Sequence, residues 1–305
     1  MVAFCYYMSR WYSQRLFCFV LLQEVESCKM PLLFAPKCGA LTTLKPRQNL
    51  IKAQLDSFTA AYNRRDFIAD DPILVPHGFS KQQDIEIAGF FAAIFAWGQR
   101  KTIISKAQEL MQRMDGAPHA FVLSANEREL RGLAGFVHRT FNDTDLLYMV
   151  DFLGRHYRQH HSLEQAFVPL GAVDWSVEQA LLHFHQQVFI PDWAPQRSRK
   201  HIPTPARHSA CKRLNMYLRW MVRQDAQGVD FGLWQQLKPA DLIVPLDLHV
   251  QRVAIKMGLL QRTQSDWQAA LELTQALRQF DPNDPVKYDF ALFGMGLEVR
   301  RGADW

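Results

Sequence analysis

One stretch of the chain gathers cations without any acid. Residues 193–224 contain no Asp or Glu, whereas the formal net charge of the whole chain is only +5. Because the local field attracts phosphates more strongly than net charge does, the stretch predicts a one-sided cationic surface that holds a polyanion. Its basic residues are Arg197, Arg199, Lys200, Arg207, Lys212, Arg213, Arg219 and Arg223.

A lone carboxylate, Asp247, follows an apolar run and precedes a helical apolar stripe that begins at Val250. Capping that helix is its ordinary explanation, because Asp is a preferred N-cap residue. Held in place by backbone N–H groups, the same carboxylate could also face a developing cation or orient a water molecule. An acid of this kind beside a cationic surface favours a nucleic-acid-processing enzyme.

Lys212 stands at a second predicted helix start. Ser209 is a natural N-cap, which places Lys212 in the first turn of the helix that follows. The positive end of the helix dipole and neighbouring Arg213 both disfavour an ammonium there. An amine nucleophile that forms a Schiff base needs such a setting. The alternative is a lysine that simply contacts phosphate or solvent, as most surface lysines do.

Three polar residues, Gln99, Arg100 and Lys101, lie between two strongly helical segments. The run Ile85–Trp97 before them is apolar nearly all round, which is typical of a central buried helix. A loop that joins packed helices could present a polar side chain and two cations to a groove. An ordinary charged helix start explains these residues equally well.

The composition excludes several classes of protein. A chain of 305 residues, 48% of them hydrophobic, can bury a substantial core. No apolar run approaches the roughly 20 residues that span a bilayer, so we expect no membrane partner. Neither cysteines nor histidines show metal-ligand spacing, and we expect no metal and no cofactor. Four of the five cysteines fall in the first forty residues. The remainder is typical of a reduced, cytoplasmic protein.

The pattern is helical almost throughout from about residue 48. Apolar residues recur at spacings of three and four within residues 103–114, 214–222 and 250–257. Alternating strand patterns with hairpin turns are scarce. The predicted fold class is therefore all-α. Residues 1–45 read instead as a poorly structured or misassigned N-terminal extension.

Four segments carry a resemblance to a known family. The segments are Ile85–Arg100, His138–Asn142, Ser209–Trp220 and Asp284–Phe293. They look like a bacterial family of conserved proteins of unknown function, and the resemblance runs from about residue 50 to 300.

The order of the motifs is also similar, more distantly, to the helix-hairpin-helix DNA glycosylase superfamily. There, an apolar helix ends in a glutamine-bearing loop, as at Gln99, and a lysine opens a later helix, as at Lys212. A segment like 244–253 supplies the essential aspartate, here Asp247. The resemblance implies one helical domain over 46–305, with two lobes and a cleft between them. Lobe 1 would hold residues 46–115 and 265–305, and lobe 2 residues 116–264.

The resemblance also implies the roles of the site residues. Asp247 would stabilise the sugar cation or activate a nucleophile, and Lys212 would attack the anomeric carbon, giving a glycosylase with possible lyase activity. Gln99 would fill the gap left by a damaged or mispaired base extruded from duplex DNA. We expect the protein to act as a monomer. The residues expected to contact nucleic acid are Gln99, Arg100, Lys101, Arg207, His208, Arg213, His249 and Arg252.

Some features depart from the superfamily pattern. Its hairpin carries glycines whose amides hold a phosphate, but no glycine occurs between Gly171 and Gly228, and the basic run could substitute. Leu248 stands where a small hydroxyl residue is common. Two other functions stay open: a non-catalytic DNA- or RNA-binding protein, which needs the cations but not Asp247, and an interaction protein whose basic face meets an acidic partner.

Overall fold

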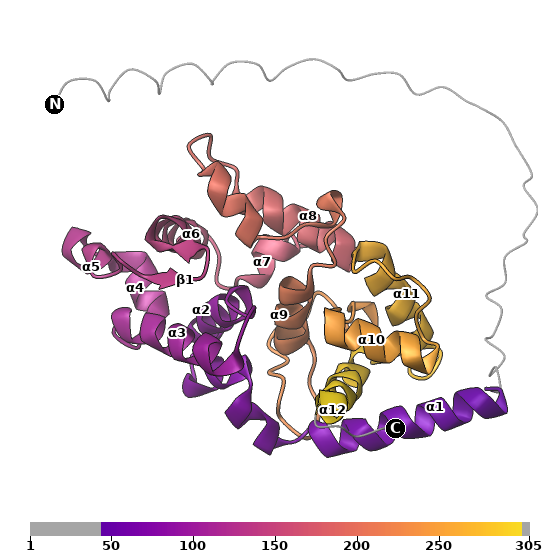
Figure 1. Cartoon of the computed structure of the whole chain (residues 1–305). Coiled ribbons are helices and arrows are strands. Elements are labelled where there is room, and N and C mark those ends of the chain that lie inside the picture. The colour runs from indigo at the N-terminus through magenta and orange to yellow at the C-terminus, as the bar shows by residue number, and fades with distance from the viewer. Residues whose placement is uncertain (1–43, 301–305) are drawn as a thin grey trace, which may run out of the picture. The chain divides into compact units, whose positions relative to one another are not determined.

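The computed structural model of the chain describes residues 44–300, without the side chain of Arg300. Their fold is helical (Figure 1), which confirms the predicted all-α class. The expected extension 1–45 lies outside the described residues except for its last two. The helices are α1 Pro46–Tyr62, α2 Gln82–Ile94, α3 Arg100–Arg113, α4 Pro118–Ser124, α5 Glu127–Arg131, α6 Asp143–Tyr157, α7 Glu164–Phe167, α8 Val177–Val188, α9 Lys212–Val222, α10 Leu248–Met257, α11 Trp267–Arg278 and α12 Asp289–Arg300.

A small antiparallel hairpin holds the regular strands found within residues 44–300. It pairs β1, Val137–His138, with β2, Phe141–Asn142. Short 3-10 turns link several helices, among them η2 at Pro72–Leu74 and η5 at Pro205–Arg207. Each helix in this part of the chain is too short or too polar to cross a bilayer.

Helix α2 is the centre of the core. Its residues from Ile85 to Ile94 are all buried, as expected of a helix that is apolar on every side. The predicted helix ran on to Trp97, but α2 ends at Ile94. The chain then turns sharply, because Gly98 has a φ of 117°, a left-handed conformation that other residues rarely adopt. The resulting loop, residues 95–99, leads directly into α3.

Helix α9 packs against α2 (Figure 1). The Tyr217 hydroxyl donates a hydrogen bond of 2.9 Å to the carbonyl oxygen of Glu86. At Gly89 the two helices approach closely, since a Cβ atom there would lie 3.0 Å from Cε of Met221. This contact fixes the start of α9, and Lys212 with it, relative to the loop 95–99.

Helix α12 packs against both α1 and α10 (Figure 1). Gly294 allows the contact with α1, because a Cβ atom at that position would clash with the Tyr62 ring. The described residues belong to one compact unit. The division into two lobes with the boundaries given above stays a prediction.

Candidate active site

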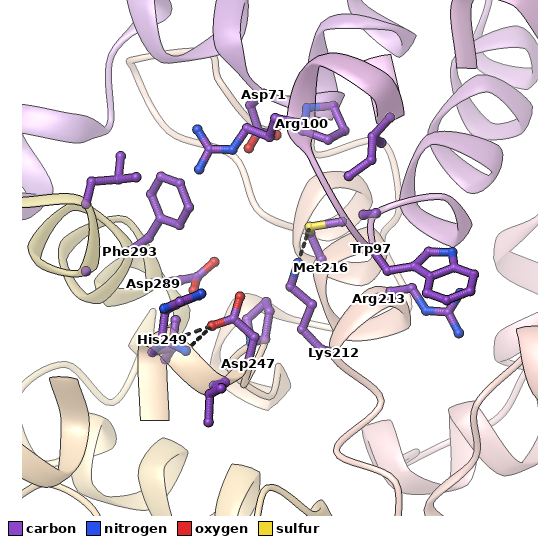
Figure 2. Close-up of a pocket in the computed structure, with 18 of the residues that line it drawn as sticks. Asp71, Trp97, Arg100, Lys212, Arg213, Met216, Asp247, His249, Asp289 and Phe293 are labelled. Atoms are coloured by element: carbon purple, nitrogen blue, oxygen red, sulfur yellow. Dashed lines mark hydrogen bonds between the residues drawn. The ribbon is translucent and has the colours of Figure 1, made fainter. Parts of the chain in front are cut away.

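The starts of four helices border one cavity of about 830 Å³ (Figure 2). They are the N-terminal ends of α3, α9, α10 and α12, joined by the loop 95–99 and by η2. Polar and apolar side chains both line it. The lining residues with a charge or a polar head group are Asp71, Gln99, Arg100, Lys212, Arg213, Arg219, Asp247, His249 and Asp289.

Lys212 is the first residue of α9, so its predicted place in the first helical turn is confirmed. The predicted cap is wrong. The N-cap residue is Cys211, which is left-handed with a φ of 51°, as is His208 with 56°. The Ser209 hydroxyl accepts a hydrogen bond from the Cys211 N–H instead, and Ser209 forms a β-bridge with Asp266. Two non-glycine residues before this helix thus adopt a conformation that glycine usually takes.

The Lys212 amine reaches into the cavity (Figure 2). Its Nζ lies 3.7 Å from Sδ of Met216, one turn further along α9. A thioether is a weak acceptor, so this contact does little to stabilise an ammonium. Among the described residues, no carboxylate lies within ion-pairing distance of the Lys212 amine. The amine is therefore not committed to a structural ion pair.

Asp247 is the N-cap of α10, as the sequence predicts. Its Oδ1 accepts hydrogen bonds from the N–H groups of His249 and Val250, at 2.8 and 3.0 Å. Within residues 44–300, no donor is hydrogen-bonded to Oδ2. The carboxylate faces the same cavity as the Lys212 amine (Figure 2). Capping thus leaves one oxygen of Asp247 for a second role.

Two further carboxylates line the cavity, and neither was predicted from the sequence as a site residue. Asp289 is 7% exposed and accepts a hydrogen bond from Arg219. Burial raises its pKa to about 6, against the opposing effects of Arg219 and Lys212. Asp71 is 8% exposed, and burial raises its pKa as well. The available signals were slight: Asp289 falls in the family-like segment 284–293, and Asp71 precedes a proline at a break in the helical pattern.

The structure brings together half of the residues expected to contact nucleic acid. Gln99, Arg100, Arg213 and His249 line the cavity. Lys101 lines a neighbouring cavity between α1 and α3. The other three, which line neither cavity, are the exposed residues Arg207, His208 and Arg252.

The two arginines of the cavity wall are held by the protein itself. The Arg100 guanidinium lies over the Phe293 ring, 4.4 Å from its centroid. Arg213 donates a hydrogen bond of 2.7 Å to the carbonyl oxygen of Ile94, and burial lowers its pKa to about 10. At neutral pH Arg213 is therefore a cation that also closes the C-terminal end of α2.

The basic run 193–224 does not form the single cationic surface that its composition predicts. Arg219 and Arg223 are buried, at 4% and 2% exposure. Arg219 pairs with Asp230 and Asp289, and Arg223 with Asp230 and two other acids. These acids follow the run in the sequence, and the fold places them next to its two buried arginines. The exposed cations of the run are Arg197, Lys200 and Arg207.

The chain belongs to a family described as "Protein of unknown function (DUF2400)", which matches residues 71–298. Neither a curated protein nor a solved structure matches the chain.

Proposed function

We propose that this protein is a DNA glycosylase that removes a damaged base extruded from duplex DNA, with Lys212 and Asp247 as its catalytic residues. The observation that carries the proposal is their convergence. An amine and a carboxylate that are distant in sequence face one cavity (Figure 2). The remote resemblance to the helix-hairpin-helix glycosylases, whose motif order includes both residues, supports the same function.

The size and the rim of the cavity fit this substrate. Its volume of about 830 Å³ falls within the range of roughly 300–1,000 Å³ that is usual for small-molecule sites. An extruded base with its sugar is such a ligand. Extrusion costs a few kcal/mol and is least unfavourable for damaged or mispaired bases. Gln99 is exposed at the rim, where it could occupy the space that the base leaves in the duplex.

The chemistry assigns one step to each residue. The bond between C1′ of the sugar and the base nitrogen breaks, and the base leaves with the electron pair. The Asp247 carboxylate stabilises the positive charge that develops on the sugar. The Lys212 amine forms a bond to C1′, the proton that it loses passes to the departing base, and ring opening gives a Schiff base. Elimination of the 3′ phosphate from that intermediate would cleave the strand.

Trapping with borohydride tests both roles. We would incubate the protein with duplexes carrying oxidised, deaminated or alkylated bases, and measure base release and covalent adducts. The wild type is expected to form an adduct that is absent in Lys212→Ala, and base release is expected to be lost in Asp247→Asn. Lys256→Ala and Asp241→Asn are matched controls, because both residues are exposed and lie outside the cavity.

The outcomes separate three cases. Base release that survives Lys212→Ala but not Asp247→Asn would indicate a glycosylase without lyase activity. Release or adducts that neither substitution affects would place the chemistry elsewhere. If the wild type releases no base from any of the duplexes, the proposal is wrong.

A non-catalytic nucleic-acid-binding protein is the second candidate. The cap bonds of Asp247 explain that residue without any chemistry, and the exposed cations Lys101, Arg207 and Arg252 lie outside the cavity. Binding to DNA or RNA that falls steeply with salt, is unchanged in Asp247→Asn and occurs without turnover would favour this function.

A further inference from the structure

The cavity has a rim and a floor that differ in exposure. Gln99 is exposed and Leu248 is 52% exposed, so both belong to the rim. Asp71, Arg219 and Phe290 are buried, at 8%, 4% and 0%, and form the floor. Figure 2 shows Asp71 across the cavity from Asp247. A ligand whose reacting atom meets Asp247 would therefore extend its far edge toward Asp71.

The Asp71 carboxylate is only partly satisfied by the protein. Its Oδ1 accepts a hydrogen bond of 3.1 Å from the Ile73 N–H and so caps η2. Within the described part of the chain, Oδ2 accepts no hydrogen bond, and no cation lies within ion-pairing distance. Arg100 and Arg219 lie beyond ion-pairing distance and act on the carboxylate only through their electric field. Asp71 lines the cavity, and its Oδ2 is not among the enclosed polar atoms of the described residues, so this oxygen is accessible to a ligand there.

We propose that Asp71 reads the edge of the extruded base and selects damaged bases that keep an exocyclic amino group. The inference rests on the proposed function and names its substrate class: oxidised or alkylated derivatives of adenine, cytosine or guanine. An amino group can donate a hydrogen bond to Oδ2. A deaminated base carries a carbonyl oxygen at the same position, so that two acceptors face each other without a hydrogen.

Pairs of lesions that differ only at this position give the test. The base 5-hydroxycytosine becomes 5-hydroxyuracil when its amino group is replaced by a carbonyl, and 8-oxoadenine becomes 8-oxohypoxanthine in the same way. We would measure single-turnover rates of base release from duplexes that carry each of the four. The wild type is expected to favour the amino member of a pair on the order of 10- to 100-fold, because the carbonyl member leaves the Asp71 oxygen without a donor.

Asp71→Asn separates recognition from folding. The Asn carbonyl can still accept from the Ile73 N–H, so η2 keeps its cap. The amide group can donate to a carbonyl, and the ratio of the two rates is expected to fall toward one or to invert. The control is Asp70→Asn, since Asp70 is exposed and does not line this cavity. Its ratio should match the wild type.

Two results overturn the inference alone. One is base release with equal rates, or faster release of the carbonyl member, by the wild type. The other is an unchanged ratio in Asp71→Asn when its thermal unfolding matches that of the wild type. If the wild type releases none of the lesions in any duplex, including those of the trapping experiment, the proposed function fails and this inference fails with it.

Discussion

Arg219 donates a hydrogen bond from Nη1 to Oδ2 of Asp289 at the floor of the cavity. Its Nε donates to Oδ1 of Asp230 at 3.3 Å, and its guanidinium carbon lies 4.4 Å from the Phe290 ring centroid. One side chain of α9 thereby holds the first turn of α12. The ion pair fixes the floor of the cavity beneath Lys212, whose charge also acts on Asp289.

The raised pKa of Asp289 makes stability depend on pH. Burial moves this pKa from 3.8 to about 6 in the folded protein. The folded protein therefore favours the protonated carboxyl. The stabilisation that Asp289 contributes is fully present below pH 3.8 and is lost as the pH rises through about 6. Relative to Asp289→Asn, the wild type should lose about 3 kcal/mol of unfolding free energy across that window. Urea unfolding of both proteins at several pH values measures the difference, and a difference independent of pH would contradict the assignment.

His201 should act in the opposite direction. It is buried, and burial lowers its pKa to about 4, although Asp145 opposes the shift. At neutral pH the imidazole is uncharged, so its 3.2 Å approach to Asp145 is not an ion pair. The His201 imidazole takes up a proton near pH 6.5 in the unfolded chain and only near pH 4 in the folded protein. The contribution of His201 is therefore present above pH 6.5 and lost as the pH falls toward 4.

The variant His201→Gln isolates this effect. The wild type should lose about 3 kcal/mol relative to the variant between pH 7.5 and pH 4, as measured by urea midpoints. The Asp289 effect has the opposite sign over an overlapping range, so each substitution has to be compared with the wild type separately. A pH profile of stability that is parallel in the wild type and His201→Gln would show that His201 does not titrate in this way.

Asp247 has two roles that substitution can separate. Asn caps a helix about as well as Asp does, so Asp247→Asn should change the unfolding free energy by less than about 0.5 kcal/mol. It removes the negative charge that faces the cavity, and base release should fall at least about 100-fold. Asp247→Ala should lose base release and also about 1 kcal/mol of stability. Equal losses of stability in the two variants would mean that the cap depends on charge.

Local features of the sequence were predicted and long-range pairings were not. The apolar run of α2 and the cap at Asp247 could be read because periodicity and cap preference act over a few residues. The start of α9 at Lys212 was predicted correctly but its cap was not, because Cys211 precedes the helix in a left-handed conformation that residues other than glycine rarely adopt. The pairing of Arg219 with Asp289 spans 70 residues. Counting the charges within residues 193–224 cannot show that an acid from another part of the chain pairs with one of these arginines in the folded protein.

Glu86 of α2 is a buried carboxylate that no cation neutralises among the described residues. Its two oxygens accept five hydrogen bonds, from Gln82, Tyr157, Ser162, the Leu163 N–H and Trp234, at 2.6–3.0 Å. These donors come from α2, the end of α6, the segment before α7 and a later loop. The carboxylate therefore joins α2 to three other parts of the chain.

Because every partner of Glu86 donates, an amide cannot replace the carboxylate. Glu86→Gln turns an N–H group toward donors and should destabilise the protein by about 1–3 kcal/mol, the usual effect of unsatisfied buried groups. Glu127→Gln is the control, since the Glu127 side chain is 81% exposed and forms a surface ion pair with Arg131; its effect should stay below about 0.5 kcal/mol. Urea unfolding measures both. A loss below about 1 kcal/mol in Glu86→Gln would mean that the hydrogen bonds of this carboxylate contribute little to holding α2 in place.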